Sequence, residues 1–413
     1  MSSFANGCSS VRIVLVMFLS VAALGAGSHR PALADAALDG TNPAQWRLIW
    51  KTDPAHQATV SWSTAKSGES HRLHYKVADA DSFVALDCQR NGKYSNKKSD
   101  LRLYYHHARL TDLEPSTRYA IVLESDGQKS PEMTFITAPA DDREFQLIFG
   151  GDSRTDRPMR RKVNQMLSRM LAEKSSIIAF AHGGDYIETG KSLEQWSAWM
   201  SDHELTVTAD GRMLPIIPAR GNHDTGPIFN QLFDFPKKNK NYYTLDLSSE
   251  VCLITLNTET STAGDQAEWL SAQLQRARPS NRWLLAQYHR PAYPAIKLPS
   301  GARQSWVPLF EKYHLDLAME ADGHNIKRTP PIRGDKVDPT GVIYIGEGGL
   351  GVPQRTPFTD RWFLQPPGIA SKGHHVQLLT FTQATLGCRV ILLGGKLFDE
   401  VVIVPYRQRL SAR

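Results

Sequence analysis

The spacing of hydrophobic and polar positions divides the chain into two parts that meet near residue 140. In residues 45–139, short runs of alternating apolar and polar residues are separated by turn-forming residues, which predicts a small antiparallel β-sandwich. Residues 138–142, Ala-Pro-Ala-Asp-Asp, have the composition of a linker. The strands predicted for the first part are residues 47–50, 59–63, 72–77, 106–110, 119–123 and 133–137.

The second part, residues 144–405, alternates strand-like and helix-like patterns, which predicts a layered α/β domain with a mixed sheet. A methionine-rich apolar stripe follows Pro158 at helical spacing, so a helix with one buried face is expected there. Further helices are predicted at residues 192–203 and 266–278, and strands at 144–148, 176–181, 213–218, 242–247, 251–257, 282–287, 375–381, 390–393 and 401–404.

Polar residues stand at the ends of five strand-like runs in the second part, and most of them follow a glycine. Glycine lets the backbone turn sharply where a strand ends, and ligands bind α/β sheets outside the carboxyl ends of the strands. Two carboxylates, one amide and two imidazoles are side chains that bind metal ions. The sequence therefore predicts a metal site formed by Asp152, Asp185, Asn222, His289 and His324.

The composition fits a globular protein with two domains, because 413 residues with 41% apolar and 22% charged side chains can bury a large core. The formal net charge of +6 helps to attract an anionic substrate but is too weak to indicate nucleic acid binding. The small cluster formed by Arg90, Lys93, Lys97 and Lys98 is expected to be a solvated face.

The first 34 residues have the pattern of a cleaved signal peptide. Arg12 precedes an apolar run at residues 13–24, and an Ala-Leu-Ala cleavage site follows at residues 32–34. Because the run is too short to span a bilayer, no membrane anchor is expected, and the protein is predicted to be secreted or periplasmic.

Removal of the signal peptide leaves Cys88, Cys252 and Cys388, so at most one disulfide can form. Cys252 and Cys388 lie in apolar runs, where buried free thiols are expected.

Residues 113–119, Leu-Glu-Pro-Ser-Thr-Arg-Tyr, resemble the signature of fibronectin type III domains. The resemblance implies that Tyr119 folds back to bond the backbone of the preceding corner, and that Trp62 is the core tryptophan. It concerns the fold alone, and a passive packing module is the expected role of this domain.

The five strand-end motifs, in their order, resemble those of calcineurin-like metallophosphoesterases, and among these the purple acid phosphatases with a fibronectin-like domain in front. The resemblance implies a hydrolase of phosphate mono- or diesters, in which water activated by one or two transition-metal ions (Fe, Zn or Mn) attacks phosphorus in line. It also implies that Asp185 bridges two metal positions and that His223 contacts the phosphate and protonates the leaving group. Asp152 would belong to the first position, and Asn222, His289 and His324 to the second.

Three positions depart from the family pattern, and all three fall on ligands of the first metal position. Arg154 and Ile326 stand where relatives have histidines, and Glu188 stands where purple acid phosphatases have tyrosine. We therefore expect this position to be weak or empty, with Arg154 binding a phosphate oxygen in its place. The alternative is that Arg154 pairs with Asp152 or Asp156 and holds the turn. Glu188 is expected to point either at the site or at solvent.

Three functions remain compatible with the sequence. The first is an exported phosphoesterase acting on small phosphate esters, and the second is a non-catalytic relative that binds phosphorylated or sugar ligands at the cell surface. In the third, a structural cell-surface protein, the sandwich is the functional part. The first is favoured because His223 and Asn222 are both present. The loops at residues 225–240 and 292–304 are expected to line the pocket, and they leave the substrate and the oligomeric state open.

Overall fold

The computed structural model describes residues 37–96 and 100–411, so the predicted signal peptide lies outside the described residues, as do Lys97 and Lys98.

The six strands predicted for the first part are all present, with small differences at their ends. Three short strands, β4, β5 and β8, were not predicted because they lack a clear apolar alternation. One sheet of the sandwich contains β1 (Ala44–Ile49), β2 (Ala58–Thr64), β6 (Tyr104–Leu110) and β5 (Arg90–Lys93), and the other contains β4 (Val84–Asp87), β3 (His71–Val77), β7 (Arg118–Ser125), β8 (Gln128–Lys129) and β9 (Met133–Ile136).

The tyrosine corner predicted for the sandwich is confirmed. The hydroxyl oxygen of Tyr119 accepts a hydrogen bond of 2.8 Å from the backbone N–H of Glu114. Trp62 is fully buried between the two sheets and donates its indole N–H to the Ser125 hydroxyl at 3.0 Å. The corner therefore fixes the start of β7, and the tryptophan fills the core, as the resemblance implied.

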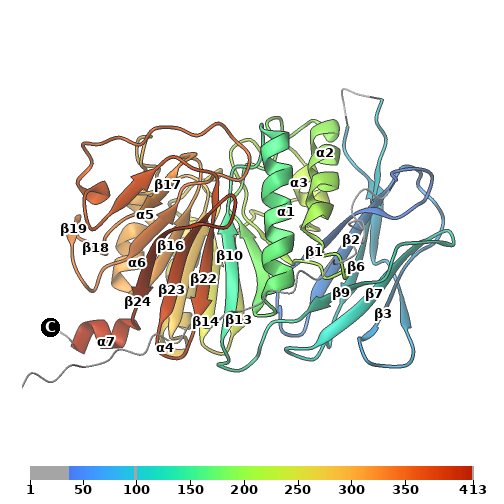
Figure 1. Ribbon diagram of the computed structural model, residues 1–413, viewed down its shortest axis with the longest axis horizontal. Coiled ribbons are helices and arrows are strands. Elements are labelled where there is room, and N and C mark those ends of the chain that lie inside the picture. Colours follow the sequence, from blue (N-terminus) through green and yellow to red (C-terminus); the bar gives the residue numbers. More distant parts are fainter. Residues whose placement is uncertain (1–36, 97–99, 412–413) are drawn as a thin grey trace, which may run out of the picture. The chain divides into compact units, whose positions relative to one another are not determined.

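The second part is a layered α/β domain, as predicted, with two sheets packed face to face and helices on the outer face of each (Figure 1). Successive residues of β10 (Phe145–Gly150) point to opposite sides. Phe149 packs between the sheets, whereas Ile148 packs under helix α1 (Arg157–Glu173). Helix α1 begins at the N-cap Asp156 with Pro158 in its first turn, and the predicted methionine stripe packs beneath it.

The remaining elements complete these layers. The first sheet of the α/β domain adds β11 (Ile177–His182), β12 (Ile216–Pro218), β22 (His375–Phe381), β23 (Leu386–Leu392) and β24 (Leu397–Ile403), with helices α2 (Leu193–His203) and α3 (Ile228–Leu232) packed near α1. The second sheet contains β13 (Tyr243–Ser248), β14 (Val251–Thr255), β15 (Trp283–Tyr288), β16 (Leu317–Glu320), β20 (Ile343–Gly346), β17 (Ile326–Arg328) and β21 (Ile369–Ser371), with α4 (Asp265–Ser280), α5 (Ala302–Ser305) and α6 (Val307–Lys312) on its outer face. The described residues also form η1 (Glu204–Thr206), β18 (Ile332–Arg333), β19 (Lys336–Val337), η2 (Trp362–Leu364) and α7 (Tyr406–Ser411).

The sandwich and the α/β domain share one sheet, which the sequence pattern did not predict. Strand β1 pairs in parallel with β12, with Ile49 opposite Ile216, and the backbone N–H of Trp50 donates to the Ile216 carbonyl at 3.0 Å. The resulting ten-stranded sheet runs from β24 through β10 and β1 to β5. Figure 1 labels β24, β10, β1 and β6 along this sheet. The first strand of the described chain is therefore an interior strand of the main sheet.

A buried carboxylate ties the sandwich to the α/β domain. The side chain of Asp234 is fully buried and forms ion pairs with Lys51, Arg90 and Arg109 of the sandwich at 2.6–2.9 Å. The prediction that Arg90 belongs to a solvated face is therefore wrong, because its guanidinium pairs with a carboxylate of the other domain.

The cysteines and the helices bear on two of the sequence predictions. Cys252 and Cys388 are buried, Cys88 is partly buried, and all three are free thiols. Within residues 37–96 and 100–411, no helix combines the length and the apolar character needed to cross a membrane.

Candidate metal centre

The two glycine turns after β10 and β11 present Asp152 and Asp185 side by side. Both aspartates have positive φ values, 59° and 58°, which short polar residues tolerate better than most. The turns bond to each other, because the N–H of Asp152 donates to the Gly184 carbonyl at 3.0 Å and that of Ser153 to the Asp185 carbonyl at 2.9 Å. Both carboxylates are buried and held in one orientation.

Gly184 and Gly221 are required where the turn after β11 meets the turn after β12. A Cβ atom on Gly184, which has a φ of 97°, would lie 2.6 Å from the Gly221 nitrogen, and a Cβ on Gly221 would lie 2.3 Å from Asp185 Oδ1. Only glycine permits this approach. Asp224 holds these two turns together, because its buried carboxylate accepts hydrogen bonds from the N–H groups of Asp185 and Gly221 at 2.9 and 2.8 Å. Burial, followed by the charge of Asp185, raises the pKa of Asp224 to about 8.

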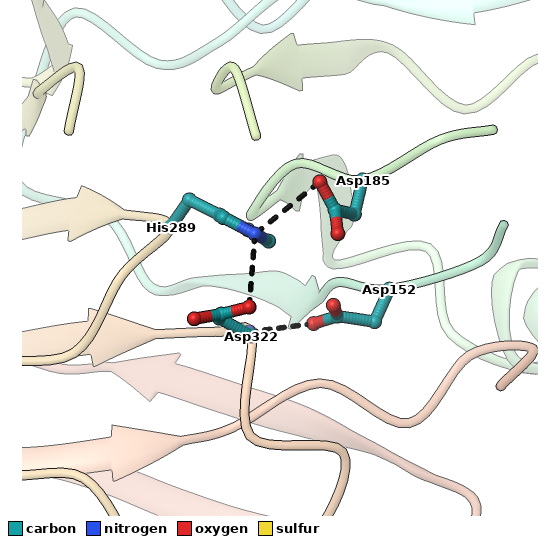
Figure 2. A group of neighbouring side chains, drawn as sticks. All are labelled: Asp152, Asp185, His289 and Asp322. Atoms are coloured by element: carbon teal, nitrogen blue, oxygen red, sulfur yellow. Dashed lines mark hydrogen bonds and ion pairs between the residues drawn. The ribbon is translucent and has the colours of Figure 1, made fainter. Parts of the chain in front are cut away.

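His289 stands at the centre of a set of oxygen atoms. Its Nδ1 donates to the Gly183 carbonyl at 2.9 Å, so its Nε2 faces the site. Nε2 lies 3.1 Å from Asn222 Oδ1, 3.3 Å from Asp185 Oδ1 and 3.6 Å from Asp322 Oδ1. Figure 2 shows the imidazole between the carboxylates of Asp185 and Asp322. Burial opposes the imidazolium, but the neighbouring Asp185 raises the pKa of His289 well above its ordinary value.

Asp322 is the site residue that sequence analysis missed. Ligand atoms of Asp152, Asp185, His289 and Asp322 all lie within 4.8 Å of one another (Figure 2). Asp322 directly precedes the Gly323-His324 motif after β16, and its φ is 70°. The sequence signal that could have identified Asp322 was its position as a carboxylate at the end of a strand. It was overlooked because the family motif begins one residue later.

Asp152 and His324 form the other side of the centre. Asp152 Oδ2 accepts from the Asp322 N–H at 2.8 Å, and Asp152 Oδ1 lies 3.2 Å from His324 Nε2. Asp152 Oδ1 and His324 Nε2 are buried and face each other, and neither atom has another hydrogen-bond partner. An unsatisfied buried polar group costs about 1–3 kcal/mol, so these converging atoms fit a bound cation. The structure thus brings the five predicted ligands together, and their role as ligands stays a prediction.

Arg154 pairs with neither of the partners considered from the sequence. Its Nε lies 3.3 Å from Asp185 Oδ2, and its Nη1 donates to the carboxylate of Glu188. Asp156 instead caps helix α1 by accepting from the Met159 N–H at 3.1 Å. Glu188 therefore contacts the site through Arg154, although 44% of its side chain is exposed.

His223 reaches the same edge of the centre. Its Nδ1 donates to the Glu188 carbonyl at 2.7 Å, so Nε2 faces Asp185 and lies 3.9 Å from Oδ2. Burial lowers the pKa of His223 below its ordinary value. About a quarter of the side chain is exposed, so the ring can meet a ligand that enters the centre.

Tyr186 is turned away from the centre. It is fully buried and stacks on His182, with the ring centroids 3.9 Å apart, and it packs edge-on against Trp199. His182 and His203 are thus packing residues, because His203 also stacks on Trp199.

The loop at residues 292–304 reaches the centre through Lys297, whose ammonium group bonds the carboxylate of Asp322. The start of this loop is fixed by two buried carboxylates. Glu320 accepts from the N–H of Ala292 at 2.6 Å, and Glu347 accepts from that of Ala295 at 2.8 Å. This loop therefore borders the site, as expected from the sequence.

Two family models match the chain in the order that the structure displays. Residues 43–137 match the N-terminal domain of purple acid phosphatases, and residues 158–325 match the calcineurin-like phosphoesterases. By family, the chain is a purple acid phosphatase-like metallophosphoesterase. Its predicted fold class is likewise confirmed: an all-β domain precedes an α/β domain with mixed sheets.

Two plant relatives of this metallophosphoesterase carry phosphatase names, and one of the two is described as probably inactive. This chain is 24% identical over 321 residues to purple acid phosphatase 21 of Arabidopsis thaliana, and the match covers 68% of this chain and 70% of that protein. It is 23% identical over 279 residues to the probable inactive purple acid phosphatase 27 of the same plant, covering 55% and 44%. The structure of a purple acid phosphatase from yellow lupin seeds shares the fold, with a TM-score of 0.77 and 18% identity over 90% of this chain and 76% of that one.

Proposed function

We propose that this metallophosphoesterase hydrolyses small phosphate esters at the centre between the ends of β10, β11, β12, β15 and β16. The observation that carries the proposal is the buried cluster of Asp152, Asp185, His289 and Asp322, whose ligand atoms lie within 4.8 Å of one another, with His324 Nε2 3.2 Å from Asp152 Oδ1. The donor set fits a transition-metal ion such as Fe, Zn or Mn, because it combines carboxylates, an amide oxygen and imidazoles. Residues that would hold the ion are Asp152, Asp185, Asn222, His289, His324 and the newly found Asp322.

A bound metal ion would supply positive charge to the phosphoryl oxygens and lower the pKa of a water molecule. The protein contributes the orientation of the ligands. The Gly183 carbonyl fixes His289 so that its Nε2 faces the centre, and the Asp322 N–H fixes the carboxylate of Asp152. Such orienting contacts keep ligands ready for the ion without rearrangement.

His223 is placed to handle the proton of the leaving group. Its Nδ1 proton is committed to the Glu188 carbonyl, so its Nε2 is the atom that faces the centre and can carry the proton. Arg154 and Lys297 add positive charge beside Asp185 and Asp322, respectively. Both cations suit an anionic substrate, whether a phosphate monoester or a diester.

Export belongs to the same proposal. It rests on the signal-like pattern of residues 1–34, with Arg12 before the apolar run and the Ala-Leu-Ala site at its end. A non-catalytic ligand-binding protein is less well supported, because such a protein needs neither a leaving-group acid at residue 223 nor a buried cluster of metal-binding side chains.

The proposal is tested by phosphate release from p-nitrophenyl phosphate and bis-p-nitrophenyl phosphate. We expect hydrolysis of at least one ester that EDTA abolishes and added Mn²⁺, Zn²⁺ or iron restores. Asp185→Asn should abolish hydrolysis and metal retention with an unchanged circular dichroism spectrum, because Asp185 contacts both His289 and Arg154. Asp265→Asn is a matched control, since 81% of the Asp265 side chain is exposed. Full activity of Asp185→Asn would contradict the assignment.

A further inference from the structure

The two oxygen atoms of Asp185 face different groups. Oδ1 lies 3.3 Å from Nε2 of His289, on the side that also holds Asn222 and Asp322. Oδ2 lies 3.3 Å from Nε of Arg154. One oxygen therefore belongs to the side where the neutral and acidic donors gather, and the other faces a fixed guanidinium.

The guanidinium side offers little to a second metal ion. Arginine stays protonated in proteins, so an ion beside Asp185 Oδ2 would lie next to a permanent positive charge. The carboxylate of Glu188, which could add a ligand on this side, is already bonded to Arg154. Ile326, two residues beyond His324, has an apolar side chain that is fully buried and cannot act as a ligand.

We propose that the centre binds one metal ion per chain, and that the guanidinium of Arg154 binds a phosphoryl oxygen of the substrate from the Asp185 Oδ2 side in place of a second ion. This inference rests on the proposed function and specifies how that site holds its substrate. It makes Arg154 a substrate-binding residue and Glu188 the group that the substrate must displace.

The environment of Arg154 supports this role. Its side chain is 12% exposed, so it is held in place but still accessible. Within residues 37–96 and 100–411, no group accepts a hydrogen bond from its Nη2. Glu188 Oε2, which bonds Nη1, lies 3.8 Å from Nδ1 of His223 on the half-exposed edge of the centre. An incoming phosphate can therefore displace the carboxylate of Glu188 and bond the planar guanidinium of Arg154.

Metal content gives the first test. After dialysis against metal-free buffer, mass spectrometry of the wild-type protein should find about one tightly bound ion per chain, and Arg154→Ala should retain it. Arg157→Ala is the matched control, because Arg157 lies three residues away and shares its partner Asp202 with Arg160. Two tightly bound ions in the wild type, or loss of the ion in Arg154→Ala, would overturn the inference.

Binding of inorganic phosphate, measured by calorimetry on metal-loaded protein, gives the second test. Arg154→Ala should weaken phosphate binding about tenfold to a hundredfold, because a charge-assisted hydrogen bond is lost. Arg154→Lys should recover part of the loss, since lysine keeps the charge without the fork. Glu188→Gln should bind phosphate more tightly than the wild type, because the competing carboxylate is gone. Unchanged binding in Arg154→Ala, or weaker binding in Glu188→Gln, would contradict the proposal.

These measurements separate the inference from the proposed function. If the wild type binds one metal ion and binds phosphate through Arg154 but hydrolyses neither ester, the proposed function fails while the inference stands. If it hydrolyses an ester but binds phosphate equally well without Arg154, the proposed function stands while the inference fails. A purely turn-holding arginine would lower thermal stability and leave the phosphate dissociation constant unchanged.

Discussion

Arg109 and Asp234 meet across the junction of the two domains in a bidentate ion pair, with Nε and Nη2 of the arginine 2.7 and 2.8 Å from the two carboxylate oxygens. Lys51 and Arg90 bond the same carboxylate. Burial opposes the charge of Asp234, but its bonds to the cations, Arg109 first, hold the pKa below its usual range. The junction is therefore a polar contact built around one anion.

Asp234→Ala should destabilise the whole fold. The change leaves three cations of the sandwich without their shared partner, and removing one member of a buried ion pair costs about 3 kcal/mol or more. The free energy of unfolding in urea, measured at pH 7, checks this expectation. Asp141→Ala is the control, because Asp141 pairs with Arg143 at the surface, where such a pair contributes under about 1 kcal/mol. Equal effects of the two substitutions would show that the junction does not depend on Asp234.

His223→Ala should lower turnover about a hundredfold while the metal content stays the same, because it removes the group that handles the proton without removing a ligand. The measurement is the turnover number at saturating ester together with the metal content of the same sample. His56→Ala serves as the control, since His56 lies in the sandwich and nearly half of its side chain is exposed. An unchanged turnover number would exclude His223 from the reaction.

Iron-loaded protein should lack the visible charge-transfer band that gives the purple acid phosphatases their name. That band requires a tyrosinate ligand, and the corresponding residue here is Glu188, which bonds Arg154. Tyr186 cannot replace it, because its ring is stacked on His182 in the core. An absorption spectrum decides the matter. If a strong band appears, its loss in Tyr186→Phe would show that the tyrosine moves to the metal.

Stability should fall between about pH 6.5 and pH 3 because of buried neutral histidines such as His107. Its Nε2 donates to the Gln231 carbonyl at 2.8 Å, and its Nδ1 lies 2.6 Å from the Ser61 hydroxyl. Burial lowers its pKa to about 3, while Asp234 raises it slightly and Arg47 lowers it. In this window the unfolded chain binds the additional proton, so acid favours unfolding by up to about 1.4 kcal/mol per pH unit for this group.

The variant His107→Gln tests this pH dependence. Glutamine can still bond Gln231 but does not titrate, so the decrease in unfolding free energy between pH 7 and pH 4.5 should be smaller than in the wild type. The comparison of slopes removes any constant loss caused by the substitution. Identical slopes would mean that His107 is not held neutral in the fold.

The sequence predicted those parts of the fold that rest on local patterns. Alternation and helical spacing located the main strands and the long helices, and the Tyr119 corner followed from its motif. The pairing of β1 with β12 could not be predicted, because it joins Ile49 to Ile216 and no local signal links positions so far apart. Short exposed strands such as β5 lack the apolar alternation that marks the others.

The residues of the candidate metal centre could be predicted from the sequence because they stand at the ends of strands. The structure brings Asp152, Asp185 and His289 together as expected, and adds Asp322. The partners of Arg154 depend on where the turns after β10 and β11 place the side chains, so the sequence suggested Asp152 or Asp156 and could not reveal Asp185 and Glu188.

The shared ten-stranded sheet determines what proteolytic cleavage between the two domains would do to the fold. Residues 140–144 between the two domains are exposed and offer a protease an open segment. A single nick there would not release the sandwich, because β1 would remain hydrogen-bonded to β12 and Asp234 would still hold its three cations. The two fragments should elute together under native conditions and part only in denaturant. A sandwich produced alone would expose the unpaired edge of β1, the kind of strand edge that recruits other chains and aggregates.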